Sequence, residues 1–86
     1  MPEISRFLGI IIAMYHREHG VPHFHVTYGE YDATIDIATG DVLSGKLPRK
    51  VLARVRKWRA LHHDELIADW RLAVAREPLN KIEPLE

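Results

Sequence analysis

The fold is decided by residues 23–37, which have the sequence HFHVTYGEYDATIDI. His23 to Tyr28 alternate in the manner of a β-strand, and Tyr31 to Ile37 alternate again, with the apolar residues of that segment on one face. The pair Gly29-Glu30 between them forms a tight turn. Two alternating segments joined so closely predict an antiparallel β-hairpin.

The chain on either side of this hairpin adds further strands. Towards the N-terminus, Ile4 to Tyr15 are rich in isoleucine and predict one long strand, in which Gly9 marks a bulge. Towards the C-terminus, the turn Thr39-Gly40-Asp41 precedes Val42 and Leu43, which predict a short fourth strand. We therefore expect a sheet of three or four strands.

After Gly45 the spacing of the apolar residues changes from that of a strand to that of a helix. We predict helices at about residues 48–61 and 64–77. Pro48 suits the first turn of the first helix, where its missing N–H has no consequence, and Pro78 ends the second. The apolar stripes of the two helices are too extensive to stay exposed, so both helices are expected to pack on the sheet.

These elements predict a single domain, residues 1–86, of the α+β class. Its antiparallel sheet spans about residues 4–45, with two C-terminal helices packed on one face, in the order β-β-β-(β)-α-α. The tail, residues 78–86, is expected to dock on the core.

Composition limits the classes of protein to consider. The 86 residues include no cysteine, which excludes disulfides and thiolate metal sites and favours a reducing compartment. The apolar run from Leu8 to Met14 follows Arg6, lacks a small-residue cleavage site and is too short to span a bilayer. We therefore expect a cytoplasmic protein with no membrane contact.

Three of the six histidines, His19, His23 and His25, lie within seven positions. Strand alternation places His23 and His25 on one face, and His19 is close enough in the preceding loop to complete a trio. Three imidazoles suit a divalent transition metal, whereas two adjacent imidazoles suit metal-free acid–base cleavage of a phosphodiester. His19, His23 and His25 are therefore candidates for catalytic or metal-binding roles, although the more common role of such a pair is structural, on the polar face of a hairpin.

Residues 46–59 contain seven basic and no acidic side chains, although the net charge of the whole chain is zero. On the predicted first helix, the basic residues fall opposite the apolar stripe and form a cationic face. Such a face contacts a protein partner or phosphates, or is simply solvated. Nucleic acid is the less favoured partner, because no aromatic side chain interleaves the charges. The contact candidates are Arg49, Lys50, Arg54, Arg56 and Lys57.

The chain also resembles a bacterial family, domain of unknown function 4160, over nearly its whole length. The one departure is Val21, where members of that family often have a second proline. The resemblance rests on Ile4-Ser5-Arg6-Phe7, Gly9-Ile10, Met14-Tyr15, Pro22-His23-Phe24-His25-Val26, Leu47-Pro48, Trp58, Glu65-Leu66, Trp70 and Lys81-Ile82-Glu83-Pro84-Leu85.

What this resemblance implies is a small stand-alone protein, often encoded next to another small protein in a layout similar to toxin–antitoxin pairs. Two hypotheses follow. The first is a regulatory or interaction module that binds the small protein encoded nearby or a second copy of itself. The second is a small hydrolase, ribonuclease-like or metal-dependent, that uses His19, His23 and His25. An exposed sheet edge would favour the first, and histidines converging in a cleft would favour the second.

Overall fold

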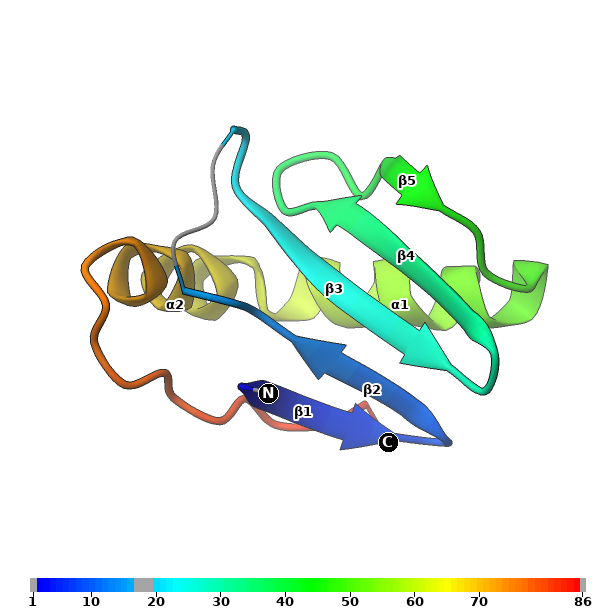
Figure 1. The fold of residues 1–86 in the computed structure, drawn as a ribbon. Helices are drawn as coiled ribbons and strands as arrows, with labels where there is room; N and C mark the ends of the chain where they lie inside the picture. Colours follow the sequence, from blue (N-terminus) through cyan, green and yellow to red (C-terminus); the bar gives the residue numbers. More distant parts are fainter. Residues whose placement is uncertain (1, 17–19, 86) are drawn as a thin grey trace.

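The computed structural model describes residues 2–16 and 20–85. These form one five-stranded sheet, in which each strand pairs antiparallel with the next along the chain, followed by two helices (Figure 1). The α+β class, the antiparallel sheet and the two C-terminal helices are confirmed. The strands are β1 (Glu3–Phe7), β2 (Ile10–Ala13), β3 (His23–Tyr28), β4 (Tyr31–Asp36) and β5 (Val42–Gly45), and the helices are α1 (Arg49–Leu61) and α2 (His63–Val74).

The sheet has five strands, so the prediction of three or four was wrong. The predicted long first strand is two strands, because the chain reverses at Leu8 and Gly9 and pairs Phe7 with Ile10. Both turn residues have positive φ, 51° for Leu8 and 78° for Gly9, which suits a two-residue hairpin turn. The residues on both sides of this turn are apolar, so no polar signal marks the reversal. Gly9 therefore lies in a turn and not in a bulge.

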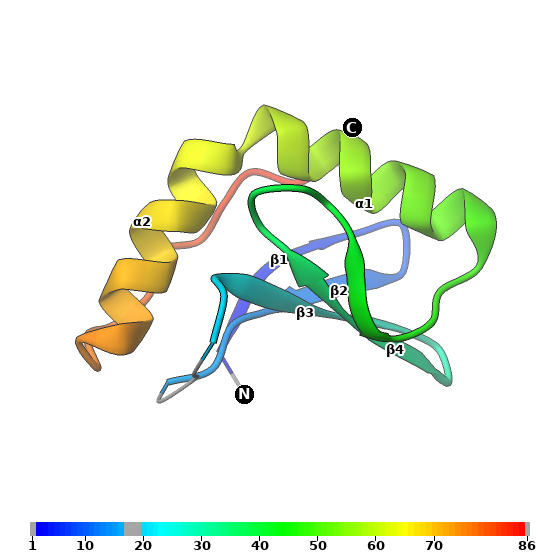
Figure 2. The same cartoon turned by 90° about the horizontal axis from the view of Figure 1, so that it is seen from above.

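Both helices cover the same face of the sheet and form a second layer (Figure 2). Phe24 and Val26 of β3 and Ile35 of β4 are fully buried in this interface. The indole of Trp58, which is 0% exposed, lies against the sheet, with its ring centroid 5.8 Å from those of both Phe7 and Phe24. The apolar stripe of the first predicted helix is thus its core face.

The second helix ends earlier than its sequence suggests. Its last residue is Val74, three residues before the predicted end. Arg76 has a left-handed φ of 61°, and the N–H of Glu77 donates back to the carbonyl of Leu72 at 2.8 Å. These bonds close the helix before Pro78 is reached, and a left-handed arginine is not a residue that sequence patterns reveal. Neither described helix is long and apolar enough to cross a membrane.

The C-terminal tail lies alongside β1 (Figure 1). Ile82 is buried, and its N–H donates to the carbonyl of Ile4 at 2.8 Å. The indole N–H of Trp58 donates to the carbonyl of Glu83, also at 2.8 Å. The tail is therefore tied both to the first strand and to the central tryptophan.

Asp69 is an acidic residue of α2 that the core almost completely encloses, with 1% of it exposed. Its Oδ1 accepts the N–H of Asn80 at 3.0 Å, whereas its Oδ2 is buried with no hydrogen-bond partner among the described residues. Burial removes the carboxyl group from water and raises its pKa above the ordinary 3.8, although the N–H of Asn80 opposes this effect. The folded chain therefore holds this proton more tightly than the unfolded chain does.

Replacing Trp58 with alanine is expected to lower the free energy of unfolding by about 3 to 5 kcal/mol, because a large buried ring is lost and a cavity remains. Urea denaturation followed by circular dichroism measures the change. Val74→Ala, at an exposed position of α2, is the control and should shift stability by less than about 0.5 kcal/mol. An unchanged midpoint for the Trp58 variant would contradict the placement of this residue in the core.

The raised pKa of Asp69 predicts a loss of stability as pH rises. Below 3.8 the carboxyl group is protonated in both states, so its full contribution is present, and it is lost as the pH passes through the folded-state pKa. Asp69→Asn keeps an oxygen for the N–H of Asn80 but cannot ionise. Unfolding measured from pH 3.8 to neutrality should show a smaller fall in stability for the variant, and identical pH profiles would refute the prediction.

Candidate functional site

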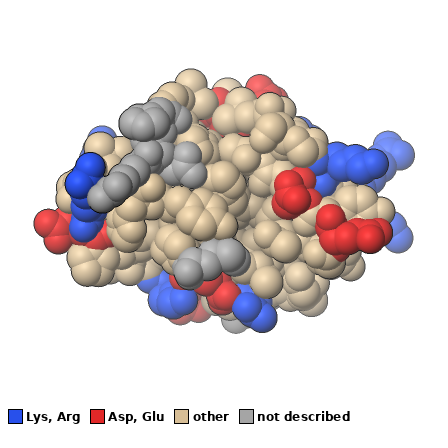
Figure 3. Space-filling view, in the orientation of Figure 1, with Lys and Arg blue, Asp and Glu red and all other residues tan. Residues whose placement is uncertain are grey.

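The side chains opposite the core project from the uncovered face of the sheet, called here the open face. His25 lies on this face between Ala13 of β2 and Thr34 of β4, and His23 lies opposite Asp36. Strand alternation thus puts the two described histidines side by side, with ring centroids 5.4 Å apart. Figure 3 shows that the centre of the open face is largely uncharged.

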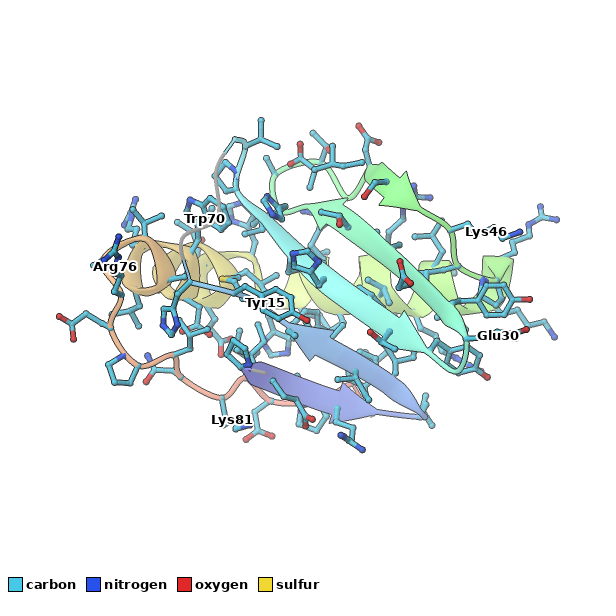
Figure 4. The ribbon with its side chains drawn as sticks, in the orientation of Figure 1. Tyr15, Glu30, Lys46, Trp70, Arg76 and Lys81 are labelled. Carbon is cyan, nitrogen blue, oxygen red and sulfur yellow. The ribbon has the colours of Figure 1, made fainter. Side chains whose placement is uncertain are left out.

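Two further rings extend this pair into a row of four. Tyr15, just beyond β2, meets His25 edge to face at 4.6 Å between centroids. Trp70 of α2 lies 4.9 Å from His23 at the end of the sheet where β3 begins (Figure 4). The sequence analysis did not identify either as a site residue, since Tyr15 ends the predicted first strand and Trp70 lies within the second predicted helix. No local spacing connects residues that meet only in the folded chain.

The two histidines differ in burial and in what holds them. His23 is 7% exposed, and its Nδ1 lies 2.7 Å from the carbonyl oxygen of Val21. A carbonyl accepts but does not donate, so Nδ1 carries the proton. His25 is half-buried and therefore offers more of its ring to a ligand on the open face. His23 is fixed in place, whereas His25 is the better placed of the two to contact another molecule.

The third predicted member of the trio, His19, lies outside the described residues. In the part of the chain that the structure describes, no group of three His, Cys, Asp or Glu side chains is placed to hold a metal ion. A metal site built on His19, His23 and His25 therefore stays a prediction.

The cationic residues of α1 divide between two flanks of the helix. On one flank, Nε of Arg56 donates to the carbonyl of Gly40 at 2.9 Å, and Nη1 of Arg59 donates to the carbonyl of Ile37 at 2.8 Å. We call this side the β5 flank, because both carbonyls belong to the β4–β5 connection. Arg49 shares it, since seven residues are about two helical turns.

The other side of α1, the tail flank, faces the end of the chain. It borders a hollow of about 360 Å³ that is lined by Lys57, Leu61, Glu83, Pro84 and Leu85. Lys50 and Arg54 lie on the same side as Lys57 by helical spacing. Leu61, the last residue of α1, is 64% exposed on this flank. The five predicted contact residues therefore lie on two separate flanks of α1 and do not form one surface.

β5 forms an edge of the sheet. Its inner side pairs with β4, with Leu43 bulged out of the register between Val42 and Ser44. Its outer side has no neighbouring strand among the described residues, so N–H and C=O groups that point outward can accept another strand. Gly45 has a φ of 76°, and a β-carbon there would collide with the carbonyl of Asp32, so the close approach of β5 to β4 requires glycine.

The amino-acid sequence was compared with known proteins. A family model named domain of unknown function (DUF4160) matches residues 9–71. The chain belongs to this family. A search of curated proteins and one of solved structures each found no match.

The DUF4160 match extends from the turn before β2 into the last turns of α2. It therefore contains both described histidines of the open face, the β5 edge and both flanks of α1. β1 and the tail, which bond to each other through Ile4 and Ile82, lie outside it. The described histidines, the β5 edge and the basic residues of α1 in this DUF4160 chain thus fall within the part that the family model matches, whereas Glu83, Pro84 and Leu85 beside the tail flank lie outside it.

Proposed function

We propose that this chain is a regulatory or interaction module, one component of a toxin–antitoxin-like pair, which binds a small protein partner by accepting a strand at the outer edge of β5. The observation that supports this proposal is the unpaired outer side of β5 in the described part of the chain. The described histidines lie on an open sheet face and not in the hollow beside α1, an arrangement that suits contact with a macromolecule better than enclosure of a small substrate.

An open strand edge is complementary to one kind of ligand, another extended backbone. Its N–H and C=O groups recur at the spacing of a strand, so an added strand satisfies them while its side chains meet those of the neighbouring strand. Leu43 supports this reading, because it is an apolar residue that is 45% exposed on the edge itself. Loss of that exposed area on binding would contribute to affinity.

The opposite edge of the sheet does not offer the same site. The tail lies along β1, where Ile82 donates to Ile4 and Nζ of Lys81 donates to the carbonyl of Glu3 at 2.6 Å. Glu3 and Arg6 also form an ion pair on β1, with Oε1 and Nη2 2.7 Å apart. Charged side chains and a covering segment are common protections of an edge strand, so β5 is the better acceptor.

The partner that we propose is the small protein encoded next to members of this family. A second copy of the chain could pair through the same edge, and the two occupants differ in the complex that they form. The first gives a complex of two different proteins, and the second gives a dimer of the protein purified alone.

Leu43→Pro is expected to abolish co-purification of the neighbouring protein, because proline removes an N–H from the edge and obstructs an incoming strand. Leu43 has no register partner on β4, so the fold should tolerate the change. Co-expression and affinity purification measure binding, and circular dichroism checks the fold. Leu43→Asn, which removes the apolar side chain alone, should weaken binding and serves if the proline variant does not fold.

Val74→Asn is the matched control, because Val74 is a similarly exposed aliphatic residue at the end of α2. It should leave co-purification unchanged. Retention of the partner by both folded Leu43 variants would exclude the β5 edge. Size-exclusion chromatography of the protein alone distinguishes the neighbouring protein from a second copy.

The second candidate function is a histidine-dependent hydrolase, and the contact between His23 and His25 favours it. If the open face cleaves RNA, His25→Ala should abolish cleavage while the fold is retained, because His25 is half-buried. Degradation of a labelled RNA measures the activity, with Thr27→Ala on the same strand as the control. Equal rates for the native chain and His25→Ala would sink the hydrolase hypothesis for this residue.

A further inference from the structure

We propose that the strand accepted by β5 is acidic: it carries Asp or Glu side chains that contact Lys46, Arg49 and Arg56, and those that meet the two arginines lie at alternate positions on its helix side. This inference rests on strand addition at β5 and names the chemistry of the partner. It follows from the position, the exposure and the pairing of these three cations.

All three cations lie next to the place that an added strand would occupy. Lys46 directly follows β5, and its N–H donates to the carbonyl of Asp32 at 2.9 Å. Arg56 reaches the carbonyl of Gly40 in the β4–β5 connection, which holds the β5 flank of α1 beside that edge. Arg49 lies two turns before Arg56 on the same flank. A strand on the outer side of β5 would therefore present its helix-side residues to Arg49 and Arg56, and it would pass Lys46 at the end of β5.

The charges of this group are open to a partner. Lys46, Arg49 and Arg56 are exposed, and none of them forms an ion pair within the described part of the chain. The bond from Arg56 to a carbonyl leaves its positive charge without a counter-ion. Basic side chains gather at the end of the molecule where β5 passes into α1 (Figure 3), and Lys46 is labelled at this end in Figure 4.

The stability of α1 alone would favour acidic residues at its start and not basic ones. Arg49 and Lys50 stand at the start of the helix, where its dipole disfavours positive charge, and Pro48 supplies no side-chain cap. α2 has the favourable pattern instead, with Asp64 and Glu65 in its first turn. Local features that oppose helix stability are expected where function requires them, and contact with an anionic partner is such a requirement.

The charge of the open face sets the orientation of the partner strand. Asp32 lies on this face and Glu30 at its margin, at the same end of the molecule as Lys46 (Figure 4). An added strand would lie two strand spacings, about 10 Å, from β4, and like charges at this distance repel weakly, so carboxylates of the partner are disfavoured on that face. Because successive side chains of a strand point to opposite faces, the partner strand should alternate acidic with uncharged residues.

Calorimetry with two short acetylated peptides tests the inference on the full-length protein. In one peptide Glu alternates with Thr, and in the other Ser alternates with Thr. The Glu peptide should bind more tightly, and Lys46→Glu combined with Arg49→Glu should weaken it about tenfold, because like charges across an interface repel. Added salt should weaken the Glu peptide more than the Ser peptide.

Two other charge reversals serve as controls, each with the same change in net charge. Arg71→Glu with Arg76→Glu alters exposed residues at the end of α2 and should change binding by less than about twofold. Lys50→Glu with Arg54→Glu alters the tail flank of α1 and should have a smaller effect than the β5-flank pair. Equal affinity for the two peptides, or equal losses from both α1 pairs, would overturn the inference.

Failure of this inference differs from failure of strand addition. If Leu43→Pro abolishes binding of both peptides and reversal of Lys46 and Arg49 changes nothing, the edge accepts a strand with no acidic preference. If neither peptide binds, strand addition itself fails. Binding of a single-stranded RNA oligonucleotide that is lost with the same reversal would assign the cations to phosphates and overturn the acidic strand.

Discussion

The contacts of Trp58 hold together the three parts of the chain. Its indole packs against Phe7 and Phe24 of the sheet, belongs to α1, and donates its N–H to the carbonyl of Glu83 in the tail. One buried residue thus couples the sheet, the helices and the end of the chain. Because the core occupies one whole face of the sheet, the surfaces left for binding are the open face, the strand edges and the outer sides of the helices.

Much of this architecture follows from the period of the apolar residues. Alternation identified β3 and β4, and helical spacing identified both helices, since in each case one face is apolar and the other polar. The spacing of apolar residues did not reveal the turn at Leu8 and Gly9, because the residues on both sides of this turn are apolar. It also failed at Arg76, because a left-handed non-glycine residue depends on its surroundings more than on its own preference. The alternation of apolar and polar residues is also weak in β5, because this strand is short and bulged.

The candidate surfaces were predictable to the extent that local geometry determines them. Strand alternation alone placed His23 beside His25. The rings of Tyr15 and Trp70 joined them through contacts between distant segments, which spacing does not encode. In the same way, the basic residues of α1 formed one face on a helical wheel, but the bond from Arg56 to Gly40 and the hollow beside Lys57 divide them into two. The division depends on what packs beside the helix.

The unequal edges of the sheet also determine how far an assembly can grow. In the part of the chain that the structure describes, the tail covers the β1 side through the bond from Ile82 to Ile4, and β5 alone remains open. A sheet with two open edges can extend into a fibre, whereas a sheet with one stops when that edge is filled. Each sheet can therefore accept one further strand. Two copies paired through this edge would form a closed dimer, and in a complex with a different protein this chain would contribute one strand-pairing site.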